Sequence, residues 1–120
     1  MRRDWDVMRE IMLELEDAGS VTTTLNPSAV EDHPRDLVCY NMILLKEAGL
    51  AEGSVRYRND GNADCKLLRL TFSGHELLDE IRPKPVWEKI KSYSKEHGVE
   101  LSLNVVKMVA PIVLQKMLNP

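Results

Sequence analysis

The sequence predicts an α+β fold, in which helical segments surround a single β-hairpin. Apolar residues recur at three- and four-residue steps over residues 4–18, as on the buried face of a helix. After Gly49 the pattern changes to an alternation of polar and apolar residues, which is typical of strands. Residues 59–62, Asn-Asp-Gly-Asn, then favour a tight turn between strands at 54–58 and 66–70.

Two helices and a short strand are predicted before the hairpin. Asp4 is a suitable N-cap for the first helix, and Gly19 supplies a residue that adopts the left-handed conformation at its end. The β-branched residues at 21–25 predict a short strand, which we expect at a sheet edge. Pro34 suits the first position of a second helix that continues to Ala48, because its φ is already helical.

Two further helices are predicted after the hairpin. Ser73 and Glu76 have the spacing of a capping box, in which each side chain binds the backbone amide of the other residue. The third helix begins there and is interrupted by Pro83 and Pro85. Pro85 then opens a fourth helix over residues 86–97.

The final segment, from its cap at Ser102 to Leu118, is apolar on nearly every side. Pro111 is expected to kink or split it, because proline removes a helical hydrogen bond. The longest nearly apolar run, at 105–114, is interrupted by Lys107 and Pro111 and is far shorter than the roughly 20 residues of a membrane span. Such a helix needs more than one covering surface, so we expect a homodimer; the alternative is that the segment folds back over the first helix. The expected dimer contacts are Val105, Val109, Ile112, Val113 and Met117.

The order helix, strand, helix, hairpin, helix is that of a winged helix, so residues 1–82 are predicted to form a winged-helix-like domain. Residues 83–120 follow as a two-helix C-terminal extension of the same domain unit. In this fold the helix before the hairpin enters the major groove of DNA, and the hairpin lies along the DNA backbone. The fold alone does not establish that function, because winged helices also serve as protein-docking modules.

Two stretches resemble those of winged-helix regulators: Leu-Leu-Lys-Glu-Ala-Gly-Leu at 44–50, and Arg-Leu-Thr-Phe-Ser-Gly-His-Glu-Leu-Leu at 69–78. A second set extends over nearly the whole chain and comprises Arg3-Asp4-Trp5-Asp6, Arg9-Glu10-Ile11, Tyr40, Leu44-Leu45, Ala48-Gly49-Leu50, Arg69-Leu70-Thr71, Gly74-His75, Leu78-Asp79, Ile81-Arg82 and Val86-Trp87. This set resembles the bacterial and prophage family called domain of unknown function 2513. The resemblance implies a winged-helix-like body, a C-terminal helical tail and an origin in a bacterium or its prophage.

Charge is unevenly distributed along the 120 residues, whose net charge is −3. Residues 1–50 carry five Lys/Arg and ten Asp/Glu, a net charge of −5. Residues 51–120 carry eleven Lys/Arg and nine Asp/Glu, a net charge of +2. The pI of about 5.6 is unusual for a strong nucleic-acid binder, so DNA binding would depend on local basic patches.

Two functions are compatible with this pattern, and neither is enzymatic. We expect a small DNA-associated regulator that binds double-stranded DNA through the helix at 35–48 and the hairpin at 54–70. The alternative is a protein-interaction or dimerisation module on the same fold, in which the hairpin arginines are merely solvated. The expected DNA contacts are Arg35, Asn41, Lys46, Arg56, Arg58 and Lys66.

The sequence carries no recognisable catalytic, metal or cofactor motif. His33, His75 and His97 lack metal-site spacing with either cysteine, and no glycine-rich phosphate-binding loop occurs. We therefore expect no enzyme activity, no cofactor and no small-molecule ligand. Because no signal-peptide pattern is present, we expect a cytoplasmic protein in which Cys39 and Cys65 stay reduced, with Cys39 buried and inert.

Overall fold

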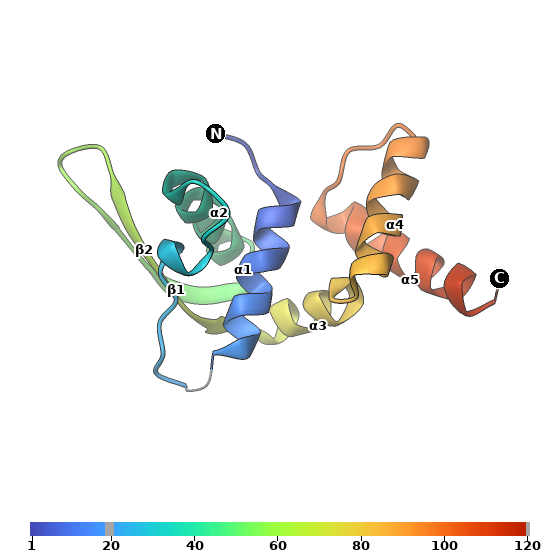
Figure 1. Cartoon of the computed structure of the whole chain (residues 1–120), viewed down its shortest axis with the longest axis horizontal. Helices are drawn as coiled ribbons and strands as arrows, with labels where there is room; N and C mark the ends of the chain where they lie inside the picture. Colours follow the sequence, from blue (N-terminus) through green and yellow to red (C-terminus); the bar gives the residue numbers. More distant parts are fainter. Residues whose placement is uncertain (19–20, 120) are drawn as a thin grey trace. The chain divides into compact units, whose positions relative to one another are not determined.

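Residues 1–18 and 21–119 are described by the computed structural model (Figure 1). Within these residues the chain forms five α-helices, one short 3₁₀ helix and a two-stranded antiparallel hairpin, which confirms the predicted α+β class. The chain divides into two compact units, Met1–Glu76 and Leu77–Pro120. This boundary lies within helix α3 (Phe72–Ile81), whereas the sequence analysis placed it after residue 82.

Helix α1 (Trp5–Asp17) begins at the predicted cap. The Asp4 carboxylate accepts hydrogen bonds from the backbone amides of Asp6 and Val7, at 3.0 and 3.2 Å. The apolar stripe of the helix is buried and consists of Trp5, Val7, Met8, Ile11, Met12 and Leu15. The predicted role of Gly19 at the end of the helix lies outside the described residues.

The segment between α1 and the second helix contains less sheet than predicted. Of the predicted strand at 21–25, only Leu25 pairs, as an isolated antiparallel bridge to Leu67 with backbone hydrogen bonds of 2.7 and 3.0 Å. Residues 21–24 are exposed. Their β-branched side chains therefore gain no burial from pairing, which is the usual source of strand stability. A short 3₁₀ helix, η1 (Pro27–Ala29), follows the bridge.

Helix α2 (Arg35–Glu47) begins one residue later than predicted. Pro34 lies at the N-cap rather than in the first turn, because its ψ of 140° is outside the helical region. Gly49 follows the helix with a left-handed φ of +73°, as expected for a glycine in that position. The buried side of the helix consists of Val38, Cys39, Asn41, Met42 and Leu45.

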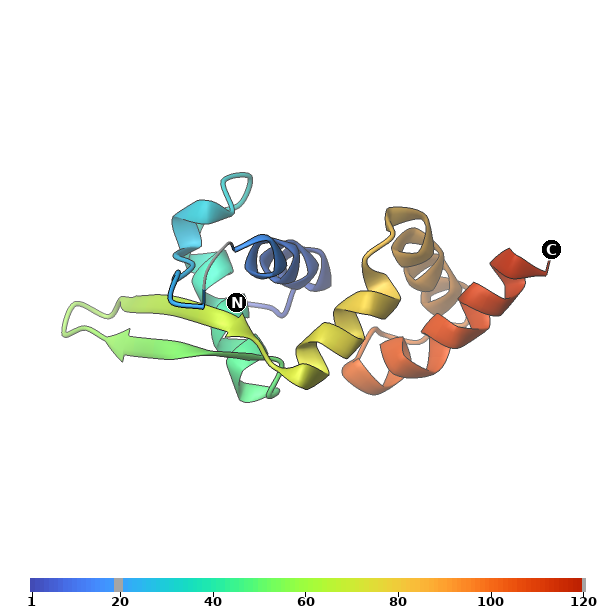
Figure 2. The same ribbon diagram turned by 90° about the horizontal axis from the view of Figure 1, so that it is seen from below.

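Strands β1 (Ala51–Tyr57) and β2 (Ala63–Leu70) pair antiparallel and form the predicted hairpin (Figure 2). Gly61 lies in the connecting turn with a φ of +84°, which a residue with a side chain rarely adopts. The register shifts between Glu52 and Gly53. A Cβ at Gly53 would collide with the backbone of β2, so this position requires a glycine.

The two faces of the hairpin differ in chemistry. Arg56 pairs with Asp64, and Val55 pairs with Cys65; directly opposite residues point to the same face. The face of Cys65 also holds Leu67, and both residues are buried. The face of Arg56 and Asp64 is polar, so it is the face on which basic side chains of the hairpin gather.

Thr71, rather than Ser73, caps helix α3. The Thr71 hydroxyl accepts a hydrogen bond from the backbone amide of Gly74 at 3.0 Å and donates one to the carbonyl of Gly49 at 2.6 Å. The predicted capping box of Ser73 and Glu76 is therefore wrong, because the helix has already begun before Ser73. The Thr71 hydroxyl thus links the end of α2 to the start of α3.

The second unit contains helices α4 (Lys84–Glu96) and α5 (Leu103–Leu118). Pro85 lies in the first turn of α4, as predicted. Ser102 caps α5, also as predicted, and accepts a hydrogen bond from the Val105 backbone amide at 3.2 Å. The buried apolar side chains of the two helices are Val86, Trp87, Ile90, Val106, Val109, Ala110 and Val113.

Helix α5 continues through Pro111, so of the two expected outcomes, a kink or a split, the split does not occur. A proline inside a helix removes one backbone hydrogen bond, and its ring crowds the carbonyl of the preceding turn. Val109 and Val113, on either side of Pro111, are both buried. Their burial stabilises the helix on both sides of the missing bond.

Candidate nucleic-acid interface

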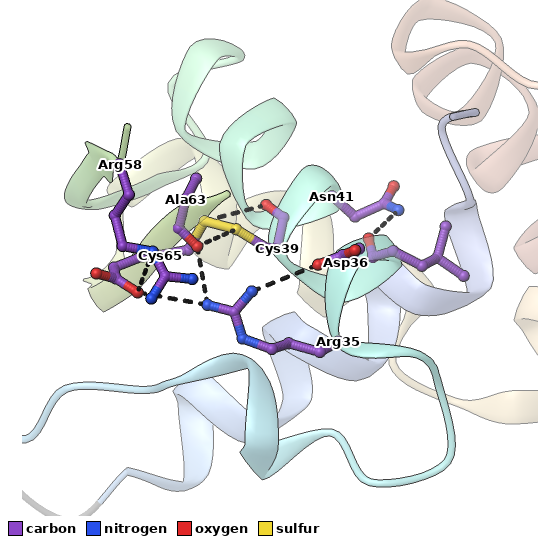
Figure 3. The surroundings of a disulfide bond; sticks show 9 residues. Arg35, Asp36, Cys39, Asn41, Arg58, Ala63 and Cys65 are labelled. Carbon is purple, nitrogen blue, oxygen red and sulfur yellow. Dashed lines mark hydrogen bonds and ion pairs between the residues drawn. A yellow bond between two sulfur atoms is a disulfide. The ribbon is translucent and has the colours of Figure 1, made fainter. Parts of the chain in front are cut away.

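A disulfide between Cys39 and Cys65 joins helix α2 to strand β2 (Figure 3). The two Cα atoms are 5.6 Å apart, and the residues are 5 and 2% exposed. The burial of Cys39 confirms the prediction, whereas the expectation of two reduced thiols is wrong. The cysteines are 26 residues apart, and it is the packing of α2 on the apolar face of the hairpin that brings them together.

Arg35, at the first turn of α2, connects the helix to the start of β2 (Figure 3). Its guanidinium donates a hydrogen bond to the carbonyl of Ala63 at 2.8 Å and lies 3.5 Å from the Asp64 carboxylate. It also lies 3.4 Å from the carboxylate of Asp36. The side chain is nevertheless 45% exposed, so part of the guanidinium is accessible to a ligand.

Arg58 approaches the same carboxylate from the hairpin turn. Its Nε lies 3.8 Å from Asp64 and 3.6 Å from Asp60. The Asn62 backbone amide donates a hydrogen bond to Asp60 at 3.0 Å, and this bond, with Arg58 nearby, holds the pKa of Asp60 below its ordinary value. Asp64 therefore lies between two arginines, each of which also has a second carboxylate within 4 Å, Asp36 for Arg35 and Asp60 for Arg58.

A concavity of about 480 Å³ lies beside the polar face of the hairpin. Three of the predicted DNA contacts line it: Arg35 from α2, Arg56 from β1 and Lys66 from β2. Asp64 lines it as well, and residues 26–28 form one side. The structure thus brings together cations that lie up to 31 positions apart in the sequence. We call this surface the basic concavity.

Asn41 does not belong to this surface, and its predicted contact with a base edge is wrong. The residue is 0% exposed. Its Oδ1 accepts a hydrogen bond from the Asp4 backbone amide at 2.9 Å, and its Nδ2 donates one to the carbonyl of Leu37 at 2.9 Å. Lys46 is exposed near the end of α2 and does not line the basic concavity.

A second concavity, of about 240 Å³, lies between α2 and the hairpin turn. Arg35 lines both concavities. The α2 side chains that line the second one include Asp36, Tyr40 and Ile43, and Arg35 is its one lining residue with a cationic side chain. The face of α2 beside the turn therefore offers few donors to phosphates or to base edges.

The sequence analysis missed Asp64, which lies between the cations. The hairpin register contained the signal, because a strand pair closed by the turn at 59–62 places Asp64 opposite Arg56. The contact between Arg35 and the Ala63 carbonyl carries no signal in the sequence, since it depends on how α2 packs on the hairpin.

The histidines lie apart from this surface. His33 contacts the carboxylate of Glu10 at 2.9 Å, and the ring of His97 stacks on Tyr93 with centroids 4.1 Å apart. His75 is exposed in helix α3. Across residues 1–18 and 21–119, no three His, Cys, Asp or Glu side chains gather as a metal site would require. The same residues contain no helix with the length and apolarity of a bilayer span.

The five predicted dimer contacts on α5 are not all on its surface. Val109 and Val113 are 3 and 4% exposed and belong to the core, although Val113 also lines a groove on the surface of the second unit. Val105 and Ile112 are partly buried, whereas Met117 is exposed. The helix is buried on the side that packs on α4, which the apolar sequence pattern could not single out.

The model of the family described as hypothetical protein (DUF2513) matches residues 2–100. The chain belongs to this family, as the sequence resemblance predicted. The family match includes the basic concavity and helix α4. An uncharacterized protein of Haemophilus influenzae is 36% identical over 118 residues, which cover 98% of this chain and 99% of the relative. No solved structure matches the chain.

Proposed function

We propose that the first unit is a winged-helix module and that this family member acts as a small DNA-associated regulator. The order of elements supports the proposal. Helix α1, the bridge at Leu25, η1, α2 and the hairpin follow one another as the helices, first strand and wing of a winged helix do. Leu25 pairs with β2 on the edge away from β1, which is the place of the first strand in such a sheet.

The observation that carries the proposal is the convergence of Arg35, Arg56 and Lys66 on the basic concavity. Cations on one surface neutralise neighbouring phosphates and release condensed counterions from the duplex. Three such contacts would weaken the affinity roughly 40-fold between about 50 and about 200 mM salt. This steep dependence on salt distinguishes phosphate binding from association through apolar surfaces.

The proposed contact is with the DNA backbone more than with the bases. Asn41 is buried, and the α2 side chains beside the turn, Asp36, Tyr40 and Ile43, include no cation. A bidentate contact to a base typically contributes about 1–3 kcal/mol of discrimination, and few donors of that kind are available here. We therefore expect similar affinities for duplexes of different sequence.

Fluorescence anisotropy with a labelled mixed-sequence duplex tests the proposal at about 50 and about 200 mM salt. Arg56→Ala and Lys66→Ala should each weaken binding and reduce the salt slope by about 1. Arg69→Ala is the matched control, because Arg69 lies on the same hairpin, 2.6 Å from Glu52, and does not line the basic concavity. Absence of binding by the unaltered protein at low salt, or equal losses in all three variants, would refute the proposal.

A protein-interaction module on the same fold is the second candidate function. The face of α2 between Asp36 and Ile43 favours it, because the concavity there combines Tyr40 and Ile43 with a single cationic side chain, that of Arg35. The net charge of the first unit also favours it, since residues 1–76 carry nine Lys/Arg and fourteen Asp/Glu. This candidate predicts no anisotropy change with the duplex at either salt concentration.

A further inference from the structure

The second unit has its own surface groove, which the proposed DNA contact does not use. The groove has a volume of about 570 Å³ and lies between helices α4 and α5. Helix α4 lines it with Lys89, Ser92, Tyr93 and Glu96, and helix α5 lines it with Val113, Lys116 and Met117. We call it the α4–α5 groove. Its lining residues recur at three- and four-residue steps, so each helix presents one continuous stripe.

The walls of the groove are held by contacts within the unit. The Tyr93 ring stacks on His97 with a centroid separation of 4.1 Å, and the ring nitrogen Nδ1 of His97 lies 2.9 Å from the Tyr93 carbonyl. The Lys116 ammonium lies 5.3 Å from the centre of the Tyr93 ring, within the range of a cation–π contact. The groove is therefore preformed, which reduces the entropic cost of binding.

Apolar side chains are exposed at the α5 end of the groove. Met117, which lines it, is 37% exposed, and the following Leu118 is 76% exposed. Val113 contributes an apolar floor. Large apolar side chains in this position lose contact with water when a partner covers them, and each adds to the affinity.

Charges of both signs surround this apolar floor. Lys89, Glu96 and Lys116 are all exposed. Within the described part of the chain, neither Lys89 nor Glu96 forms an ion pair. A surface with charges of both signs is complementary to a second copy of itself where a two-fold axis places its acidic residue opposite a basic residue of the other copy. A partner that carries only acidic or only basic residues would place some of them against groove residues of the same charge.

We propose that the α4–α5 groove is the contact between two copies of this chain, related by a two-fold axis. Met117 of each copy enters the groove of the other and packs on Val113 and Tyr93. Glu96 of each copy faces Lys116 of the other. Of the dimer contacts predicted from the sequence, Val113 and Met117 line this groove. Val109 does not line it and is buried in the core of its own unit.

Sedimentation velocity over a micromolar concentration range measures the dimer dissociation constant without DNA, so the result does not depend on the proposed function. Met117→Asp should weaken the dimer at least about tenfold, because it places a carboxylate against the apolar floor. Met108→Asp is the matched control, since Met108 lies on the same helix, is 63% exposed and does not line the groove. Thermal unfolding of each variant verifies that the second unit remains folded.

A charge exchange tests the two-fold arrangement itself. Glu96→Lys and Lys116→Glu should each weaken the dimer about tenfold, because each places like charges opposite one another twice in the symmetric interface. The two substitutions together should restore the dissociation constant to within about threefold of its original value. A monomer at every concentration, equal effects of Met108→Asp and Met117→Asp, or no recovery in the double variant would each overturn the proposal.

Discussion

The side-chain oxygen of Asn41 accepts a hydrogen bond from the backbone amide of Asp4, at a distance of 2.9 Å. Asp4 in turn caps helix α1 through the amides of Asp6 and Val7. A buried side chain in the middle of α2 therefore positions the residue that begins α1. This role accounts for the burial of Asn41, which is 0% exposed although its side chain is polar.

Asn41→Ala is expected to destabilise the protein by about 2 kcal/mol, because it leaves the Asp4 amide without its buried acceptor. Urea unfolding followed by circular dichroism measures this loss. Asn59→Ala, at an exposed position in the hairpin turn, should change the free energy of unfolding by less than about 0.5 kcal/mol. If Asn41→Ala were as stable as Asn59→Ala and instead abolished duplex binding, Asn41 would be a DNA contact after all.

Reduction of the Cys39–Cys65 disulfide is expected to lower the free energy of unfolding by about 3 kcal/mol. The bond closes a loop of 26 residues, and a cross-link of that span lowers the chain entropy of the unfolded state. Urea unfolding with and without dithiothreitol measures the difference. The double variant Cys39→Ala/Cys65→Ala should show the same unfolding curve under both conditions. Two titratable thiols in the unreduced, unfolded protein would contradict the bond.

Thr71→Val is expected to cost about 1–2 kcal/mol, because it removes the hydroxyl that caps α3 while keeping a β-branched side chain of similar size. The amide of Gly74 and the carbonyl of Gly49 both lose their partner. Ser73→Ala serves as the control and should change the stability by less than about 0.5 kcal/mol. If urea unfolding showed a larger loss of stability for Ser73→Ala than for Thr71→Val, Ser73 would be the cap of α3.

Local patterns predicted several elements well. The caps at Asp4 and Ser102, the hairpin turn at Gly61 and the place of Pro85 in the first turn of α4 were all predicted from neighbouring residues. The strand at 21–25 was predicted with less success, because β-branched side chains favour a strand only where pairing buries them. Here only Leu25 has a pairing partner.

The amino-acid sequence by itself determined where the helices begin and the hairpin turns, since capping and turn formation depend on residues a few positions apart. Tertiary packing decided which side chains meet: the bond of Cys39 with Cys65, the burial of Asn41 and the reach of Arg35 to the Ala63 carbonyl. Each of these contacts joins residues 26 or more positions apart, and each depends on the packing of α2 against α1 or the hairpin. For that reason the sequence predicted six DNA contacts, but it could not distinguish the three that line the basic concavity from Asn41, which is buried.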